Sequence, residues 1–234
     1  MQVAGLSKDK NGKINGVIAS DLEDGKEYNL YAKAVINATG VFVDDILQMD
    51  IPTQQPMVRP SQGIHLVLNK SFFKGNKALM IPETPDGRVL FAVPWHDHIL
   101  LGTTDTPLNI LRIEPKALDE EIDFILNTAG KYLISVPGRK DVLSVFAGLR
   151  PLAATSNNTN STKEISRSHK IIVNNSGLIT ITGGKWTTYR KMAEDTVNKI
   201  INLGILKHVA CSTADLKIHG YPTNTADKSY LSIY

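Results

Sequence analysis

The chain has 234 residues, of which 42% are hydrophobic and 21% are charged, and its formal net charge is +3. This composition is ordinary for a globular chain with a buried core, and the small, scattered excess of basic residues gives no reason to expect nucleic-acid binding. The only cysteine, Cys211, excludes an internal disulfide and favours a reducing compartment. No apolar run approaches the roughly 18 residues that a transmembrane helix needs.

The first third of the chain is expected to be mainly strands. Apolar and β-branched residues predict strands at 14–20 and 27–36, and a short helix is predicted from Val41 to Met49. The segment Ile51 to Pro60 contains three prolines and indicates a crossing between two lobes. Short strands are predicted next, and their close spacing favours antiparallel pairing; they lie at 64–68, 78–81, 88–93 and 99–103.

The clearest helix is predicted over residues 115–133. Pro115 suits a first helical turn, acidic residues follow it, and apolar residues recur at helical spacing. A strand beginning at Val142 is expected to end at Arg150–Pro151, before a polar loop at 154–162. Strands at 171–173 and 178–182 and a helix over about 187–203 complete the prediction.

The run Gly183-Gly184-Lys185-Trp186-Thr187-Thr188-Tyr189-Arg190 lies between the last predicted strand and the last helix. Glycines allow close approach of the backbone, and the N-terminus of a helix offers unpaired N–H groups and partial positive charge. The run therefore indicates an anion or cofactor site, while a tight turn capped by threonine explains it equally well. Neither G-x-G-x-x-G nor the P-loop pattern occurs in the chain.

Four side chains have no obvious structural purpose: His65, Arg150, Arg167 and Lys185. Alternation places His65 on the strand face opposite Ile64 and Leu66. Each side chain alone is explained by a structural or solvent-exposed role, but the three cations together could converge on one anion. The run from Gly102 to Asp105 is expected to be a turn, and His96 and His98 lack a nearby third ligand, so no metal site is predicted.

These motifs occur in the order and spacing of a known family. N-A-T-G at 37–40, S-Q-G-I-H at 61–65, G-T-T-D at 102–105, G-L-R-P-L at 148–152, I-S-R at 165–167 and the run at 183–190 resemble the FAD-dependent glycerol-3-phosphate dehydrogenases over about residues 30–215. N-A-T-G is common to many flavoproteins, whereas G-x-R-P-L and G-G-K-x-T-T-Y-R are specific.

The resemblance implies a fold of the α+β or α/β class. It contains part of an FAD-binding dinucleotide-fold lobe and a mixed, largely antiparallel β-sheet lobe that binds substrate. The implied domains are a partial FAD-binding lobe at 1–58, a substrate-binding lobe at 59–175, a return to the FAD-binding lobe at 176–210, and the start of a C-terminal region at 211–234. Because the family's glycine-rich segment is absent, we expect the chain to be a fragment that by itself is inactive and lacks FAD.

The resemblance also implies roles for individual residues. His65, Arg150 and Lys185 correspond to catalytic positions, and together with Arg167, which corresponds to a phosphate-binding arginine, they would contact the substrate. The positions that correspond to flavin contacts are Ala38, Thr39, Gly40, Gly183, Gly184, Lys185 and Thr187.

The implied reaction of the complete protein is oxidation of sn-glycerol 3-phosphate to dihydroxyacetone phosphate, with hydride transfer to flavin N5 and a quinone or oxygen as the electron acceptor. A cytoplasmic location is expected, with peripheral contact with the inner face of the cell membrane as an option. Two alternatives stay open: another flavin-dependent oxidoreductase acting on an amino acid or a 2-hydroxy acid, and an inactive substrate-binding module.

Overall fold

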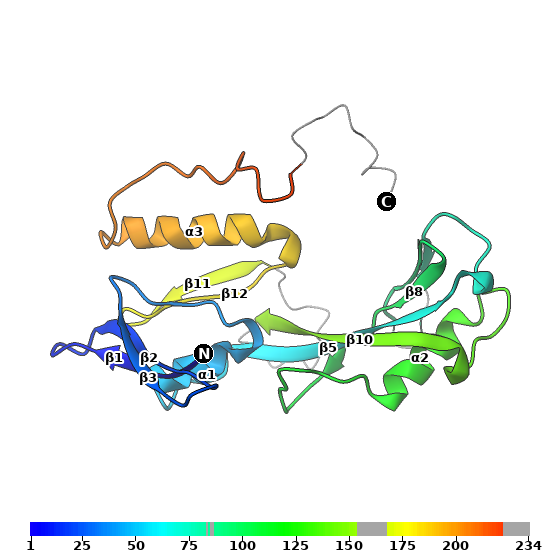
Figure 1. Cartoon of the computed structure of the whole chain (residues 1–234), viewed down its shortest axis with the longest axis horizontal. Coiled ribbons are helices and arrows are strands. Elements are labelled where there is room, and N and C mark those ends of the chain that lie inside the picture. The colour runs from blue at the N-terminus through cyan, green and yellow to red at the C-terminus, as the bar shows by residue number, and fades with distance from the viewer. Residues whose placement is uncertain (83, 85–86, 154–167, 222–234) are drawn as a thin grey trace. The chain divides into compact units, whose positions relative to one another are not determined.

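The computed structural model describes residues 1–82, 84, 87–153 and 168–221, which form two compact units (Figure 1). Unit 1 consists of residues 1–60 together with the later segment up to Leu216. Unit 2 is built mainly on residues 61–150. Arg167 and the expected loop at 154–162 lie outside the described residues.

Unit 1 begins with an antiparallel sheet of β1 (Gln2–Lys8), β2 (Ile14–Ser20) and β3 (Glu27–Tyr31), in that order. β1 was not predicted from the sequence. The strand expected at 27–36 is two strands, because β3 ends at Tyr31 and β4 (Ile36–Asn37) joins a different sheet.

The second sheet of unit 1 has the order β11 (His169–Val173), β12 (Ile179–Gly183), β4. β12 pairs in parallel with β4, with Ile179 opposite Ile36. A 3₁₀ turn and α1 (Val43–Asp50) follow β4, and another 3₁₀ turn (Trp186–Thr188) and α3 (Tyr189–Asn202) follow β12. Figure 1 shows α3 alongside β11 and β12, where His169 of β11 lies 3.1 Å from Asp195 of α3.

A buried carboxylate joins three segments of unit 1. Asp50, at the end of α1, accepts hydrogen bonds from Asn174 Nδ2 at 2.8 Å and Ser176 Oγ at 2.5 Å. Its other oxygen lies 2.8 Å from Lys8 Nζ of β1. Apolar side chains form the adjacent core: Ile14, Val43, Leu47, Val58 and Leu178.

Unit 2 contains a sheet with the order β10 (Val142–Ala153), β5 (Val58–Asn69), β8 (His98–Gly102), β7 (Leu90–Trp95), β6 (Leu79–Ile81). The short β9 (Thr106–Pro107) also pairs with β5. The pairs of β5 with β8, β8 with β7 and β7 with β6 are antiparallel, as the close spacing of these strands predicted. Two 3₁₀ turns lie at Lys70–Phe72 and Arg139–Asp141.

The two faces of this sheet differ. One face packs on α2 (Asp119–Ala129) to form a core that includes Ile64, Leu66, Leu101, Ile125 and Ala129. On the other face, His65 is opposite Gly102, which is in turn opposite Phe91. We call this second face the open face, because side chains on it such as Phe91 and Met80 are 43% and 57% exposed.

Two predicted boundaries in unit 2 were wrong. The helix expected over 115–133 is the shorter α2, because the Glu121 carboxylate accepts a hydrogen bond from Leu118 N and starts the helix there, and Gly130 ends it. The strand expected to end at Arg150–Pro151 continues to Ala153, so Arg150 lies inside β10.

Within the described part of the chain, no helix is both long and apolar enough to cross a membrane.

Candidate functional site

His65 lies on the open face in a space that a glycine leaves free. A Cβ on Gly102, directly across the strand pair, would lie 2.8 Å from both Cγ and Nε2 of the His65 ring. Toward β10, the ring stacks on Phe146 with a centroid separation of 5.1 Å and an interplanar angle of 8°. The imidazole therefore has a defined plane and position on the sheet.

The surroundings of His65 favour its neutral form. Burial lowers the pKa of the imidazole below the ordinary 6.5, and the positive charge of Arg150 lowers it further. Since a neutral imidazole can accept a proton near pH 7, His65 has the charge state that a general base needs.

Arg150 lies on the open face beside His65, and a second glycine makes room for it. A Cβ on Gly63 would collide with the guanidinium group. Arg150 Nη1 donates to the Thr104 carbonyl at 3.0 Å, and Nη2 donates to Thr103 Oγ1 at 2.9 Å. These contacts hold the plane of the guanidinium, whose fork suits planar recognition of a phosphate or carboxylate.

Asp105 also belongs to this cluster. The sequence favoured a local turn here, but the Asp105 carboxylate lies 3.7 Å from Arg150 Nη1 and accepts a short hydrogen bond from Ser61 Oγ. The carboxylate therefore contributes to the orientation of Arg150 rather than only to a turn.

A buried carboxylate lies behind the cluster, on the α2 side of the sheet. Glu121 Oε1 accepts from the hydroxyls of Thr104 at 2.8 Å and Thr106 at 2.6 Å. Oε2 accepts from Gln62 Nε2 at 2.7 Å and Leu118 N at 3.0 Å. Burial raises the pKa of the Glu121 carboxyl, but these four hydrogen bonds outweigh burial and hold it below its ordinary value.

In unit 1, two loops lie at the same edge of a sheet. The residues 38–40 follow β4 and the residues 184–187 follow β12; because these strands are parallel neighbours, both loops leave at their carboxyl ends. Ligands of open α/β sheets bind outside that edge. At this edge, Gly40, Gly183 and Gly184 have the positive φ that side chains disfavour, with values of 63°, 74° and 75°.

Local hydrogen bonds shape both loops. The buried Asn37 donates to the Val43 carbonyl at 2.9 Å and accepts from Thr39 Oγ1 at 2.8 Å. Thr188 Oγ1 donates to the Lys185 carbonyl at 2.9 Å and accepts from Lys185 N at 3.2 Å. The threonine-capped turn that the sequence allowed is thus present. It is compatible with a ligand site, because Gly183 and Gly184 lie at the carboxyl edge of the sheet.

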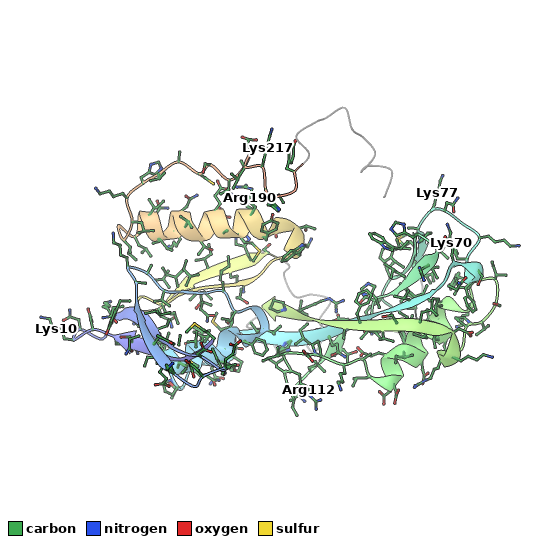
Figure 2. The ribbon with its side chains drawn as sticks, viewed as in Figure 1. Lys10, Lys70, Lys77, Arg112, Arg190 and Lys217 are labelled. Atoms are coloured by element: carbon green, nitrogen blue, oxygen red, sulfur yellow. The ribbon has the colours of Figure 1, made fainter. Side chains whose placement is uncertain are left out.

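Two basic residues outside these sites, Arg190 and Lys70, have local partners. Arg190, the last residue of the run at 183–190 and labelled in Figure 2, pairs with Glu194 one turn along α3 at 3.0 Å and donates to Thr213 Oγ1 at 3.2 Å. Lys70, labelled in the same figure, donates to Asn76 Oδ1 at 2.9 Å. These interactions give both side chains a structural role on the surface.

The structure thus brings together two of the four candidate side chains. His65 and Arg150 are neighbours in unit 2, Lys185 lies in unit 1 with the other expected flavin contacts, and Arg167 is outside the described residues. Sequence reasoning missed Glu121 and Phe146, which no linear motif marks. It noted Thr103 and Thr104 within the G-T-T-D motif but interpreted that motif as a turn. Gly63 and Gly102 were a usable signal, because a glycine inside a strand often allows another group to approach closely.

Comparison with known proteins assigns the family. A family model described as FAD dependent oxidoreductase matches residues 1–190. The mitochondrial glycerol-3-phosphate dehydrogenase of Schizosaccharomyces pombe is 43% identical over 218 residues, which cover 86% of this chain and 34% of that protein. A probable mitochondrial glycerol-3-phosphate dehydrogenase of Caenorhabditis elegans is 43% identical over 225 residues, covering 94% and 31%. The chain therefore spans about a third of the length of these relatives.

Solved structures agree in fold. The glycerol-3-phosphate dehydrogenase from Bacillus halodurans, complexed with FAD, matches with a TM-score of 0.77 and 34% identity over 90% of this chain and 40% of that chain. Glycine oxidase from Bacillus cereus, at 17% identity and a TM-score of 0.53 over 86% of this chain and 49% of that one, shares the fold. These likenesses confirm the expected fold class. With the match over residues 1–190, they show that this chain belongs to the FAD-dependent oxidoreductase family.

Proposed function

We propose that this chain forms the substrate-binding unit and part of the flavin site of an enzyme that oxidises sn-glycerol 3-phosphate to dihydroxyacetone phosphate. One observation carries the proposal: the His65 imidazole, whose pKa is lowered, and the cation of Arg150 lie side by side on the open face, in spaces left by Gly102 and Gly63. The similarity to named glycerol-3-phosphate dehydrogenases supports this choice of substrate.

The residues of unit 1 fit an FAD site. Two glycine-containing loops leave the carboxyl ends of parallel strands, and a Cβ on Gly40 would meet nothing within 4 Å. When bound, FAD would accept the hydride that leaves C2 of the substrate. The residues proposed to hold it are Ala38, Thr39, Gly40, Gly183, Gly184, Lys185 and Thr187.

The chain's own residues would bind the substrate and move its proton. A phosphate monoester carries nearly two negative charges, and the guanidinium group of Arg167 would supply forked donors for such oxygens. His65, as a neutral imidazole, accepts the proton of the C2 hydroxyl. Arg150 and Lys185 stabilise the negative charge that develops on that oxygen.

Further parts of the proposal concern the complete protein. A quinone or oxygen would take the electrons onward, and the lobes at 1–58, 59–175 and 176–210 would have the roles that the resemblance implies. The proposed location is the cytoplasm with peripheral membrane contact, although the relatives' names place those proteins in mitochondria.

The test uses the complete gene product loaded with FAD. Mixed anaerobically with sn-glycerol 3-phosphate, the parent enzyme should bleach the flavin absorbance. His65→Asn should slow bleaching by roughly 10²- to 10⁴-fold, as expected for loss of a general base, and Arg150→Ala should weaken substrate binding as well. Arg139→Ala is the matched control, because Arg139 is an ion-paired surface arginine of the same unit.

The pH profile gives a second readout. Because the pKa of His65 is lowered, the acid limb of kcat/KM should lie below pH 6.5, and replacing Arg150 by Gln should move it upward. Bleaching by an amino acid or a 2-hydroxy acid but not by glycerol phosphate would favour the alternative oxidoreductase. A complete protein that raises its Tm with glycerol phosphate but never reduces flavin would be a binding module.

A further inference from the structure

Glu121 makes more interactions than the start of a helix needs. It is 4% exposed, and among the described residues its hydrogen-bond donors are all neutral. A buried carboxylate without a cation is costly unless hydrogen bonds satisfy it. The bond from Leu118 N accounts for the start of α2, whereas the other three donors lie on β5 and on the segment that follows β8.

Thr104 joins Glu121 to the substrate site. A hydroxyl has one hydrogen, and that of Thr104 is donated to Glu121 Oε1, so its lone pairs face Ile64 N at 3.0 Å. Ile64 immediately precedes His65 on β5. The carbonyl of the same Thr104 accepts the hydrogen bond from Arg150 Nη1. One residue therefore connects the buried carboxylate to the Arg150 side chain and to the backbone next to His65.

Thr106 makes a matching bond without that connection. Its hydroxyl donates to the same Oε1, and its backbone pairs with Gln62 of β5 rather than with Ile64 or His65. The two threonines thus share a partner and differ in what lies beyond them.

We propose, on the basis of the function proposed above, that Glu121 is a positioning residue of the substrate site. Through Thr104 it holds the Arg150 guanidinium and the His65 segment of β5 in the arrangement that binds glycerol phosphate. Glu121 acts from the α2 side of the sheet and does not touch the substrate.

The test compares Thr104→Val with Thr106→Val in the complete, FAD-loaded gene product. Both variants remove one hydroxyl donor from Glu121 Oε1, so both should lower the Tm. Because small displacements of reacting groups are expensive in rate, Thr104→Val should lower kcat/KM for glycerol phosphate by about tenfold or more. Thr106→Val should leave kcat/KM unchanged. Equal kcat/KM values for the two variants would overturn the proposal.

A double-mutant cycle separates positioning from a general structural effect. If Glu121 acts through Arg150, Thr104→Val or Glu121→Gln should cost less in kcat/KM in the Arg150→Ala background than in the parent, since one of the two positioned groups is gone. Fully additive losses would refute the assignment. The threonine pair decides the matter even where Glu121→Gln does not fold.

If the proposed function were wrong, the result would differ from a failure of the Glu121 proposal. The parent enzyme would then not oxidise glycerol phosphate at all. The same cycle, run on whichever substrate bleaches the flavin, would still decide the role of Glu121.

Discussion

Replacing Gly102 by Ala tests whether the space around His65 is required for catalysis. Gly102 lies within β8 and does not have positive φ, so alanine is compatible with the backbone there. Its Cβ, however, would lie 2.8 Å from Cγ and Nε2 of His65, whereas ordinary van der Waals contact begins at 3.4 Å. Retreat toward β10 is opposed by the stacked ring of Phe146.

The size of the effect follows from that overlap. Cγ and Nε2 of His65 have to withdraw by about 0.6 Å to restore ordinary contact, and Cδ2, which lies nearer to the added Cβ, has to withdraw by about 1 Å. A misplacement of about 1 Å costs roughly 100-fold in rate, or ~2.7 kcal/mol of transition-state stabilisation. Crowding of this kind also lowers the free energy of unfolding by about 1–3 kcal/mol. We therefore expect kcat/KM for glycerol phosphate to fall far more than the stability loss alone explains.

The assay is anaerobic flavin reduction in the complete enzyme, with Gly148→Ala as the control. Gly148 lies on β10 of the same sheet, and a Cβ there would meet nothing within 4 Å. This control should keep its kcat/KM, and alanine in a strand should stabilise it by about 0.5–1 kcal/mol. A Gly102→Ala enzyme with full kcat/KM would refute the idea that the position of His65 limits the reaction.

Two further predictions concern unit 1. Asp50→Asn should lower the free energy of unfolding by about 1–2 kcal/mol, because it removes charge-assisted hydrogen bonds. The ion pair with Lys8 contributes least to this loss, because the Lys8 side chain is partly exposed to solvent. Burial raises the pKa of the Asp50 carboxyl, but its bonds to Asn174, Lys8 and Ser176 outweigh burial and hold the pKa below 3.8. The stability that the Asp50 carboxylate contributes is therefore present above about pH 4 and is lost as the pH falls through the lowered pKa. Urea unfolding should accordingly show the gap between parent and variant shrinking from about pH 7 to about pH 3, and a constant gap would contradict the assignment. Gly184→Ala should cost about 1–2 kcal/mol for its φ of 75°, and its Cβ, placed 2.5 Å from Met192 Sδ, meets the end of a flexible side chain that can move aside at small further cost. Gly177→Ala, with a φ of 90° and nothing within 4 Å, isolates the backbone cost, so the two variants should lose similar stability, while Gly184→Ala should also weaken FAD retention. A much lower melting temperature for Gly184→Ala than for Gly177→Ala would contradict the expected yielding of Met192.

Local sequence patterns predicted most of the elements of this protein. Alternation along residues 64–68 placed His65 opposite Ile64 and Leu66, and the structure confirms that face. The two glycines before Lys185 predicted a turn between a strand and a helix, which β12 and α3 confirm. Boundaries were less accurate: the Leu118–Glu121 bond shortened α2, and β10 extended through Arg150. Such boundaries depend on individual hydrogen bonds rather than on periodicity.

By itself, the sequence determined which residue types were available and on which face of its own strand each would lie, because side-chain direction repeats every two residues along a strand. Only the tertiary structure decided which strands became neighbours. Pairing of β10 with β5 brought Arg150 to His65, and parallel pairing of β12 with β4 brought the two glycine loops to one edge. The bonds of Glu121 to Thr104 and Thr106 are of the same kind, since they join α2 to a segment beyond β8. Contacts between residues distant in the chain depend on the register of paired strands and on packing, neither of which a local pattern specifies.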